Sequence, residues 1–301
     1  MLNLHRLAIL REVERRGTLA AAARALSYSP SAVSQQLAQL ERETGVALTE
    51  RVGRGVRLTD AARLLAAGAR AAIAELERAE ARLSALHALV AGRLRVATFQ
   101  TGLLSLLPGA ITALEGAHPE VRVDVAQRQA DEAVAGLLGG GFDLVVGEEY
   151  PDVPAPRSDR VHREDLGPDE LSLALPPDGP WSRAEGLADL AEALWALDPA
   201  PTAPGRWARG LCAEAGFEPR VRFDGTDLLM HLHLVEAGRA VAILPGLIGI
   251  ERTRGVRIVP LAGAPSRRLF TLVRASRADD PALRALRAEL AAAFAAPRVD
   301  G

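Results

Sequence analysis

Short polar side chains recur along residues 29–39, and their types and spacing suit hydrogen bonding to polar groups of a partner molecule. Helical spacing places them on one face of a helix, opposite the apolar residues that would be buried. Hydroxyl and amide groups on an exposed helix can reach base edges in the major groove of duplex DNA. The residues that could make such contacts are Ser29, Ser31, Ser34, Gln35 and Gln39.

Arginines follow on a predicted hairpin. Two short extended pieces, 48–50 and 56–58, flank Gly53-Arg54-Gly55, whose glycines favour a tight turn. Arg51, Arg54 and Arg57 could hold DNA phosphates, and the arginine at the tip could enter a narrowed minor groove. Each arginine taken singly is more often a solvated charge. Combined with the polar helix face, they favour a DNA-binding wing.

Three short helices are predicted to position these groups. Apolar residues recur at helical spacing from residue 4 to residue 13, and Gly17 ends this first helix. Thr18 is placed to cap the second helix. Ser29 is placed to cap the third, with Pro30 at its first position, where the missing N–H costs nothing. The pattern is typical of a helix-turn-helix, so we expect residues 1–59 to form a winged helix-turn-helix domain.

A long linker helix is predicted over residues 60–91, where apolar residues alternate spacings of four and three, as in a coiled coil. At 1.5 Å per residue this helix would be ~45 Å long. The small first domain could not cover it, so a partner helix from a second copy is the simplest cover. Homodimer and homotetramer both stay open. The predicted seam residues are Leu65, Ala69, Ala72, Leu76, Ala79, Leu83, Leu86 and Val90.

From Gly92 onward, short β-rich runs alternate with helical segments, which favours an α/β architecture with mostly parallel sheets. About 210 residues suit two small lobes. The predicted strands are 94–97, 121–125, 142–147, 171–175, 194–197, 221–223, 241–244, 256–259 and 269–273. The predicted helices are 106–117, 132–138, 205–215, 227–237 and 281–295.

Several classes of function are disfavoured. All 36 basic residues are arginine, which leaves no lysine for Schiff-base or phosphate-loop chemistry. Cys212 is the single cysteine, so it has no partner for an internal disulfide or a multi-cysteine zinc site, and we expect it to fill core space. His231 and His233 lie two apart on a predicted helix and cannot clasp one metal ion. We therefore expect no enzyme activity, no cofactor and no metal.

Charge is divided unevenly along the chain. Residues 1–91 hold 13 Arg against 9 acidic residues, and the remainder hold 23 against 29, so a basic head precedes an acidic body. No apolar run approaches the ~18 residues that a membrane helix needs. Charges near the N-terminus interrupt any signal-peptide core. We expect a cytoplasmic protein with no membrane contact.

The first 91 residues resemble the winged helix-turn-helix and linker helix of LysR-type transcriptional regulators. The residues that carry the resemblance are 17–19, 22–23, 26, 29–37, 40–41, 45–46, 48, 50–51 and 56–59. The family usually has Gln-Pro where this chain has Pro30-Ser31, which removes a common base-contacting glutamine. It usually has phenylalanine where this chain has Thr49, which thins a small hydrophobic contact under the wing.

Residues 142–147 and 234–245 are similar to that family's effector-binding region, a two-lobed α/β fold resembling periplasmic solute-binding proteins. The resemblance implies a small-molecule effector between lobe I, about 92–164 and 267–301, and lobe II, about 165–266. Residues that follow predicted strands or precede predicted helices would face this cleft, although such positions are also typical of caps and turns. They are Gln100, Thr101, Gln129, Thr202 and Thr226. Glu148 and Glu149 could favour an amine-bearing ligand there, or be two exposed loop acids.

The sequence therefore predicts an α/β protein with an N-terminal winged helix-turn-helix (1–59), a linker helix (60–91) and a two-lobed effector domain (92–301). Its predicted partners are double-stranded DNA, a small-molecule effector and further copies of itself. A solute-binding or transport component is the alternative, since lobes of this kind also capture solutes. The helix-turn-helix and the interrupted N-terminus favour the DNA-binding regulator.

Overall fold

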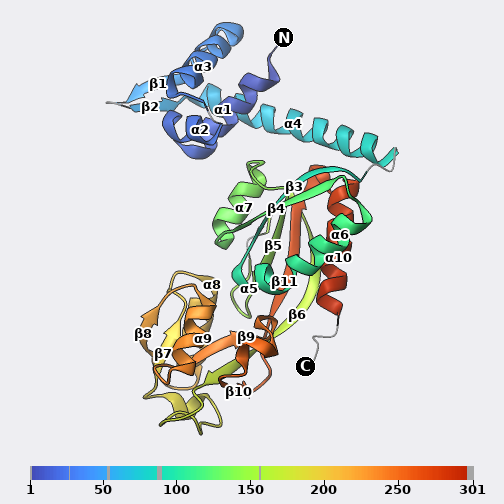
Figure 1. The fold of residues 1–301 in the computed structure, drawn as a ribbon. Helices are drawn as coiled ribbons and strands as arrows, with labels where there is room; N and C mark the ends of the chain where they lie inside the picture. Colours follow the sequence, from blue (N-terminus) through green and yellow to red (C-terminus); the bar gives the residue numbers. More distant parts are fainter. Residues whose placement is uncertain (1, 27, 53–54, 87–89, 156, 297–301) are drawn as a thin grey trace. The chain divides into compact units, whose positions relative to one another are not determined.

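The structure is a computed structural model that describes residues 2–26, 28–52, 55–86, 90–155 and 157–296. The chain divides into two compact units, Met1–Ala88 and Leu89–Gly301 (Figure 1). Among the described residues, no helix combines the length and the apolar character needed to cross a membrane.

The first unit contains three short helices, a hairpin and a long helix. They are α1 (Leu4–Arg16), α2 (Leu19–Ala25), α3 (Pro30–Thr44), β1 (Thr49–Val52), β2 (Gly55–Leu58) and α4 (Asp60–Leu86). Gly17 ends α1 in the left-handed conformation, at φ 73°, which a residue without a side chain adopts readily. The predicted helix-turn-helix is confirmed, with its caps at the expected residues.

One apolar core holds this unit together. It takes side chains from α1, α2, α3, the residue before β1 and the first turns of α4. Fully buried members include Ile9, Leu10, Ala22, Ala23, Val33, Leu40, Leu48, Ala62 and Ala66. Because α3 buries only one stripe in this core, its opposite face is free to carry polar residues.

The linker helix begins at Asp60, as predicted, but the residues at its two ends do not form an open seam. At its start, Leu65 packs against the core of its own unit, and Ala69 is buried there, so neither is an open seam position. At its end, α4 is described as far as Leu86, and residues 87–89 lie outside the described residues. Val90 is not helical and packs against the core of the second unit, just before a strand begins at Gly92. The seam expected at Val90 is therefore wrong.

Between these ends α4 carries an uncovered apolar stripe. Leu76, Leu83 and Leu86 are 46%, 57% and 81% exposed, and Ala72 and Ala79 are exposed beside them. These residues lie at the predicted spacing of four and three.

The second unit alternates strands and helices, as predicted. Its elements are β3 (Gly92–Thr98), α5 (Gln100–Ser105), α6 (Leu107–Ala117), β4 (Val121–Gln127), α7 (Ala130–Leu138), β5 (Leu144–Glu149), β6 (Val161–Leu175), β7 (Leu194–Leu197), α8 (Ala203–Glu214), β8 (Arg220–Asp224), α9 (Leu228–Glu236), β9 (Ala242–Pro245), β10 (Arg257–Pro260), β11 (Ser266–Arg274) and α10 (Pro281–Ala295).

The expectation of mostly parallel sheets is wrong for this unit. The large sheet has the order β10-β6-β11-β5-β3-β4, with β9 also paired to β6. β3 pairs parallel with β4 and β5, and β7 pairs parallel with β8. All ladders that involve β6 or β11 are antiparallel. The reason is that β11 returns along β6, so the chain reverses direction between them.

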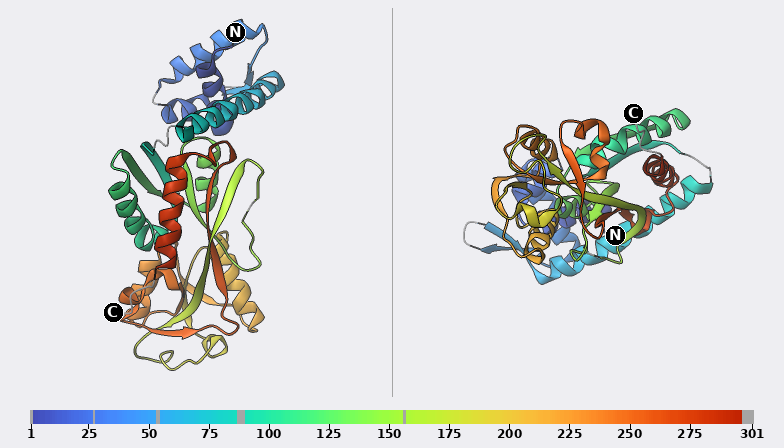
Figure 2. Two further views of the ribbon diagram at one scale, coloured as in Figure 1. Left: turned by 90° about the vertical axis from the view of Figure 1, so that its right-hand side faces the viewer. Right: turned by 90° about the horizontal axis from the view of Figure 1, so that it is seen from below.

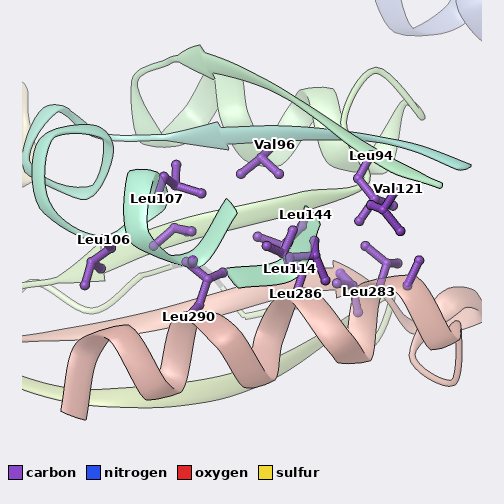
Figure 3. Close-up of a cluster of buried hydrophobic side chains, with 14 of the residues drawn as sticks. Leu94, Val96, Leu106, Leu107, Leu114, Val121, Leu144, Leu283, Leu286 and Leu290 are labelled. Atoms are coloured by element: carbon purple, nitrogen blue, oxygen red, sulfur yellow. The ribbon is translucent and has the colours of Figure 1, made fainter. Parts of the chain in front are cut away.

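β6 connects two lobes with separate cores. Its first part pairs with β11, and its last residues pair with β9 and β10 (Figure 2). In the first lobe, α6 and α10 pack against β3 and β5, and Figure 3 shows Leu114 and Leu286 meeting in this core. The second lobe has its own core around Trp195, which is fully buried. The parallel strands β3 and β5 both end near the junction of the lobes, where the polar residues described below gather.

Candidate functional site

The outer face of α3 carries the polar residues that the sequence singled out. Val33 and Leu37 are buried on the opposite face, whereas Ser31, Ser34 and Gln35 are exposed. Ser34 and Gln35 make no side-chain hydrogen bond within the described part of the chain. Their donors and acceptors are thus free for a partner.

Other predicted contact residues are already used within the unit. Ser29 Oγ accepts the Ala32 N–H at 3.1 Å and contacts Ser31 Oγ at 2.9 Å. Thr18 Oγ1 accepts the Ala21 N–H at 3.1 Å, so it caps α2. Pro30 is exposed at the first position of α3. These residues orient the two helices.

Gln39 lies nearer the end of α3 and is partly buried. Its Oε1 accepts Arg42 Nε at 3.0 Å, and its Nε2 donates to Glu43 Oε1 at 3.3 Å. Glu43 also pairs with Arg6 of α1. Gln39 therefore has fewer free hydrogen-bonding groups than Gln35.

β1 and β2 form the predicted wing. Glu50 faces Arg57 across the antiparallel ladder, and their side chains form an ion pair at 2.7 Å. Both remain largely exposed, at 44% and 64%, so this pair contributes little to stability. Arg51 lies on β1, but its side chain is outside the description, and Arg54 lies wholly outside the described residues.

The base of the wing is held by a residue that sequence reasoning did not assign. Glu41 Oε1 accepts the N–H groups of Leu48 and Thr49, at 2.8 and 2.9 Å, and also Thr49 Oγ1 at 3.0 Å. Thr49, expected only to thin an apolar contact, instead joins this cluster. The hydroxyl donates where a phenylalanine could not.

In the second unit, a buried arginine gathers residues from four elements at the junction of the lobes. Arg267 of β11 is 1% exposed and donates Nε to Asp169 Oδ2 of β6 at 2.9 Å. It also pairs with Glu148 of β5 and donates Nη2 to Thr101 Oγ1 of α5 at 2.8 Å. Its guanidinium carbon lies 5.0 Å from the centre of the Phe99 ring. The carboxylates outweigh the effect of burial and raise the pKa of Arg267.

Gln100 bridges the two lobes. Its Nε2 donates to Asp227 Oδ1 at 2.7 Å, and its Oε1 accepts the Leu228 N–H at 2.8 Å. Asp227 is also the N-cap of α9. The hydrogen bond from Gln100 lowers the pKa of Asp227. One amide side chain thus ties the start of α5 to the start of α9.

A small cavity lies beside this bridge. It measures about 20 Å³, enough for one water-sized group, and is lined among others by Tyr150, Asp198, Trp207, Leu228 and His231. Burial, followed by the charge of Glu148, raises the pKa of Asp198 to about 7. Burial also lowers the pKa of His231.

Two family models match the chain. Residues 4–63 match the bacterial regulatory helix-turn-helix protein of the lysR family, and residues 87–295 match the LysR substrate binding domain. The chain belongs to the LysR family. It is a transcriptional regulator with a helix-turn-helix DNA-binding part and an effector-binding part.

Curated relatives and solved structures agree with this membership. The chain is 31% identical over 291 residues to the DNA-binding transcriptional dual regulator OxyR of Escherichia coli K12, covering 93% of this chain and 90% of that protein. It is 30% identical over 249 residues to the regulator TcbR of Pseudomonas sp. strain P51, covering 82% and 84%. A full-length OxyR variant from Pseudomonas aeruginosa has the same fold, with a TM-score of 0.69 at 21% identity over 98% and 95% of the two chains. Full-length CbnR complexed with its target DNA matches with a TM-score of 0.55 at 26% identity over 97% and 99%.

The predicted effector residues of this LysR-family chain have different surroundings. Gln100 and Thr101 come together at the junction of the lobes. Thr202 caps α8, accepting the Gly205 N–H at 3.1 Å and donating to the Pro199 carbonyl at 2.7 Å. Gln129 is exposed at the start of α7 without a side-chain cap bond. Thr226 is partly exposed and precedes Asp227, which is the residue that caps α9.

Sequence reasoning missed Asp198, His231 and Arg267 as members of this site. Asp198 directly follows β7, so the rule that selected Gln100 after β3 would also have found it. Glu148 and Glu149 are not two loop acids, because they end β5. Glu148 faces Arg267, whereas Glu149 pairs with Arg163 at 2.9 Å.

Proposed function

We propose that α3 of this LysR-family regulator lies in the major groove of duplex DNA, with Ser31, Ser34 and Gln35 facing base edges. The supporting observation is the contrast between the two faces of α3. One face is buried in the core, and the other exposes hydroxyl and amide groups, of which those of Ser34 and Gln35 have no partner among the described residues. Ser29, Pro30 and Gln39 flank these groups on the same helix.

The wing supplies contacts to the sugar-phosphate backbone in this proposal. Arg51, Arg54 and Arg57 carry the positive charges, and Arg57 exchanges Glu50 for a phosphate. The exchange is feasible because an exposed ion pair is worth at most ~1 kcal/mol. Thr18 caps the start of α2, the helix that precedes α3.

The remaining parts adapt this DNA-binding head to regulation. The exposed stripe of Ala72, Leu76, Leu83 and Leu86 on α4 is the proposed contact between copies in a homodimer or homotetramer. The effector is proposed to bind at the junction of the lobes, beside Gln100 and Thr101, with Gln129, Thr202 and Thr226 as predicted contacts. The likeness to CbnR, which is solved with its target DNA, supports this use of the fold.

We assign this chain no reaction, because its family regulates transcription and its polar residues form contacts rather than a catalytic set. A regulator of bacterial promoters meets its DNA in the cytoplasm, and we place the chain there.

The test is fluorescence anisotropy on duplexes selected from a randomised library by the full-length protein. Gln35→Ala should relax preference at particular base pairs, with Gln127→Ala, an exposed glutamine of β4, as the matched control. Arg57→Ala should weaken all sequences alike and reduce the salt slope by about 1, with Arg160→Ala as the charge-matched control. If Gln35→Ala and Arg57→Ala both lowered the affinity for all duplexes equally, whatever their sequence, the assigned roles would be contradicted.

A further inference from the structure

We propose that the cavity lined by Tyr150, Asp198, Trp207 and His231 binds the protonated amino group of the effector. This inference rests on the proposed function, because it assigns a chemical class to the molecule that the lobes hold. The charges around the cavity, an unused hydrogen-bonding group in its wall and its small volume together favour an ammonium group.

Negative charge is in excess around this cavity. Arg267 is shared between Glu148 and Asp169, so two carboxylates already balance its positive charge. The carboxylate of Asp198 makes no side-chain hydrogen bond within the described residues, and Arg209 reaches only its backbone carbonyl, at 2.8 Å. The charged groups that act on Asp198 are Glu148 of β5, Asp224 of β8, Arg209 of α8 and Arg267 of β11. A second anion is therefore disfavoured here, and a cation is favoured.

A buried acceptor independently points to a ligand that donates hydrogen bonds. His231 is 1% exposed, and its Nε2 has no hydrogen-bond partner among the described residues. Burial lowers the pKa of His231 and so favours the neutral imidazole, in which one ring nitrogen accepts a hydrogen bond. We assign the acceptor role to Nε2, the nitrogen without a partner. A buried acceptor without a donor is costly, and an ammonium N–H would satisfy it.

The size and walls of the cavity select among cations. A volume of about 20 Å³ admits one water-sized group, such as an ammonium head, but not a planar guanidinium. The Tyr150 and Trp207 rings lie 5.7 Å apart, and aromatic rings attract organic cations. A Ca²⁺ or Mg²⁺ ion would prefer a shell of oxygen ligands, whereas His231 presents nitrogen. A transition metal would need more ligands, and the described residues contain no group of three or more His, Cys, Asp or Glu that could hold a metal ion.

Occupancy of the cavity would be sensed by both lobes. Leu228 lines the cavity, and its N–H is the group that bonds to Gln100 of α5. An amine held by His231 and Asp198 thus contacts the same turn of α9 that the bridge holds. Through this contact the amine would bind with different affinity to different arrangements of the two lobes. A ligand needs such a difference to shift the equilibrium between the arrangements and so to regulate.

The test measures binding of n-butylammonium to the full-length protein by isothermal titration calorimetry and by the thermal shift of tryptophan fluorescence. Butyrate and 1-butanol, which share the alkyl chain, are the matched controls. We expect binding by the ammonium ion alone, with affinity rising from pH 6 to pH 8 as Asp198 ionises. Asp198→Asn should lower affinity by about 30-fold or more and flatten the pH profile, while exposed Asp178→Asn should do neither. His231→Leu should lower affinity but keep the pH profile.

The outcomes separate this inference from the proposed function. Equal effects of the amine, the acid and the alcohol, or no effect of any, would overturn the amine site. If the same preparation still binds its selected DNA, the proposed DNA-binding function holds and only the amine site is overturned. Failure to bind any DNA would overturn the proposed function, whatever the amine does. The pH profile of the wild-type protein keeps the test decisive even if a variant does not fold.

Discussion

Replacing Arg267 by methionine should strongly destabilise the second unit. Methionine nearly matches the length of the arginine stem but removes the guanidinium that Glu148 and Asp169 share. Asp169 is 1% exposed, so water cannot replace the lost guanidinium. Removing one partner of a buried ion pair costs about 3–5 kcal/mol. For a unit of about 200 residues, each kcal/mol lowers the Tm by about 2–4 °C, so we expect a fall of about 6–20 °C.

Tryptophan fluorescence measures this change selectively, because Trp181, Trp195 and Trp207 all lie in the second unit. The matched control is Arg268→Met on the same strand. Arg268 is 61% exposed and its ion pair with Asp165 spans 3.4 Å, so its loss should cost ~1 kcal/mol or less.

A further measurement tests the cause assigned to this loss. Adding Asp169→Asn to Arg267→Met should restore part of the stability, because it removes one of the two negative charges that Arg267 balances in the wild type. If Arg267→Met melted within about 2 °C of Arg268→Met, the reasoning from the buried cluster would be refuted.

Three other expectations follow from burial and exposure. The pKa of Asp198, about 7, lies above the ordinary ~3.9, so its protonated form adds stability that is complete below pH ~4 and lost as the pH rises through 7. Urea unfolding should therefore show a larger loss from pH 5 to pH 8 for the wild type than for Asp198→Asn. Burial raises the pKa of Cys212 to about 12, so this thiol should react with Ellman's reagent only when the protein unfolds. Peroxide should therefore not oxidise it in the folded protein, and a change in DNA affinity on peroxide treatment would contradict this expectation. Leu83→Glu should weaken self-association in sedimentation equilibrium, whereas Ala85→Glu, also exposed on α4, should not.

The helical parts of the fold were predictable because their signals are local. Caps, glycine stops and apolar spacing act within a few residues, so α1, α2, α3 and α10 lie where the sequence placed them. β7 likewise matches its predicted bounds, since its apolar run is short and buried. The prediction wrongly included Val90 in the linker helix, because no local pattern shows that this residue packs against the core of the second unit.

The strands that join the lobes were less accessible to this reasoning. The prediction covered only residues 171–175 of β6, because its first ten residues are mostly polar and mostly exposed or half-buried, without an apolar run. α5 was missed for a related reason: it is only six residues long and has no side-chain cap bond. Strand direction depends on partners far along the chain, such as Arg267 facing Asp169, and no local pattern reports it.

The same distinction explains why the DNA-binding face was easier to find than the effector site. On α3, helical periodicity alone decides that Val33 points inward and Gln35 outward, so type and spacing suffice. At the junction of the lobes, Thr101 looks available but is occupied by a residue 166 positions away. His231 looks like an ordinary core histidine, but its buried Nε2 has no hydrogen-bond partner among the described residues. A polar group is thus available to a ligand only when it has no hydrogen-bond partner within the folded chain, and the sequence does not show this. For this reason the cavity at Asp198 and His231 carries the stronger claim to the effector than the threonines chosen by position.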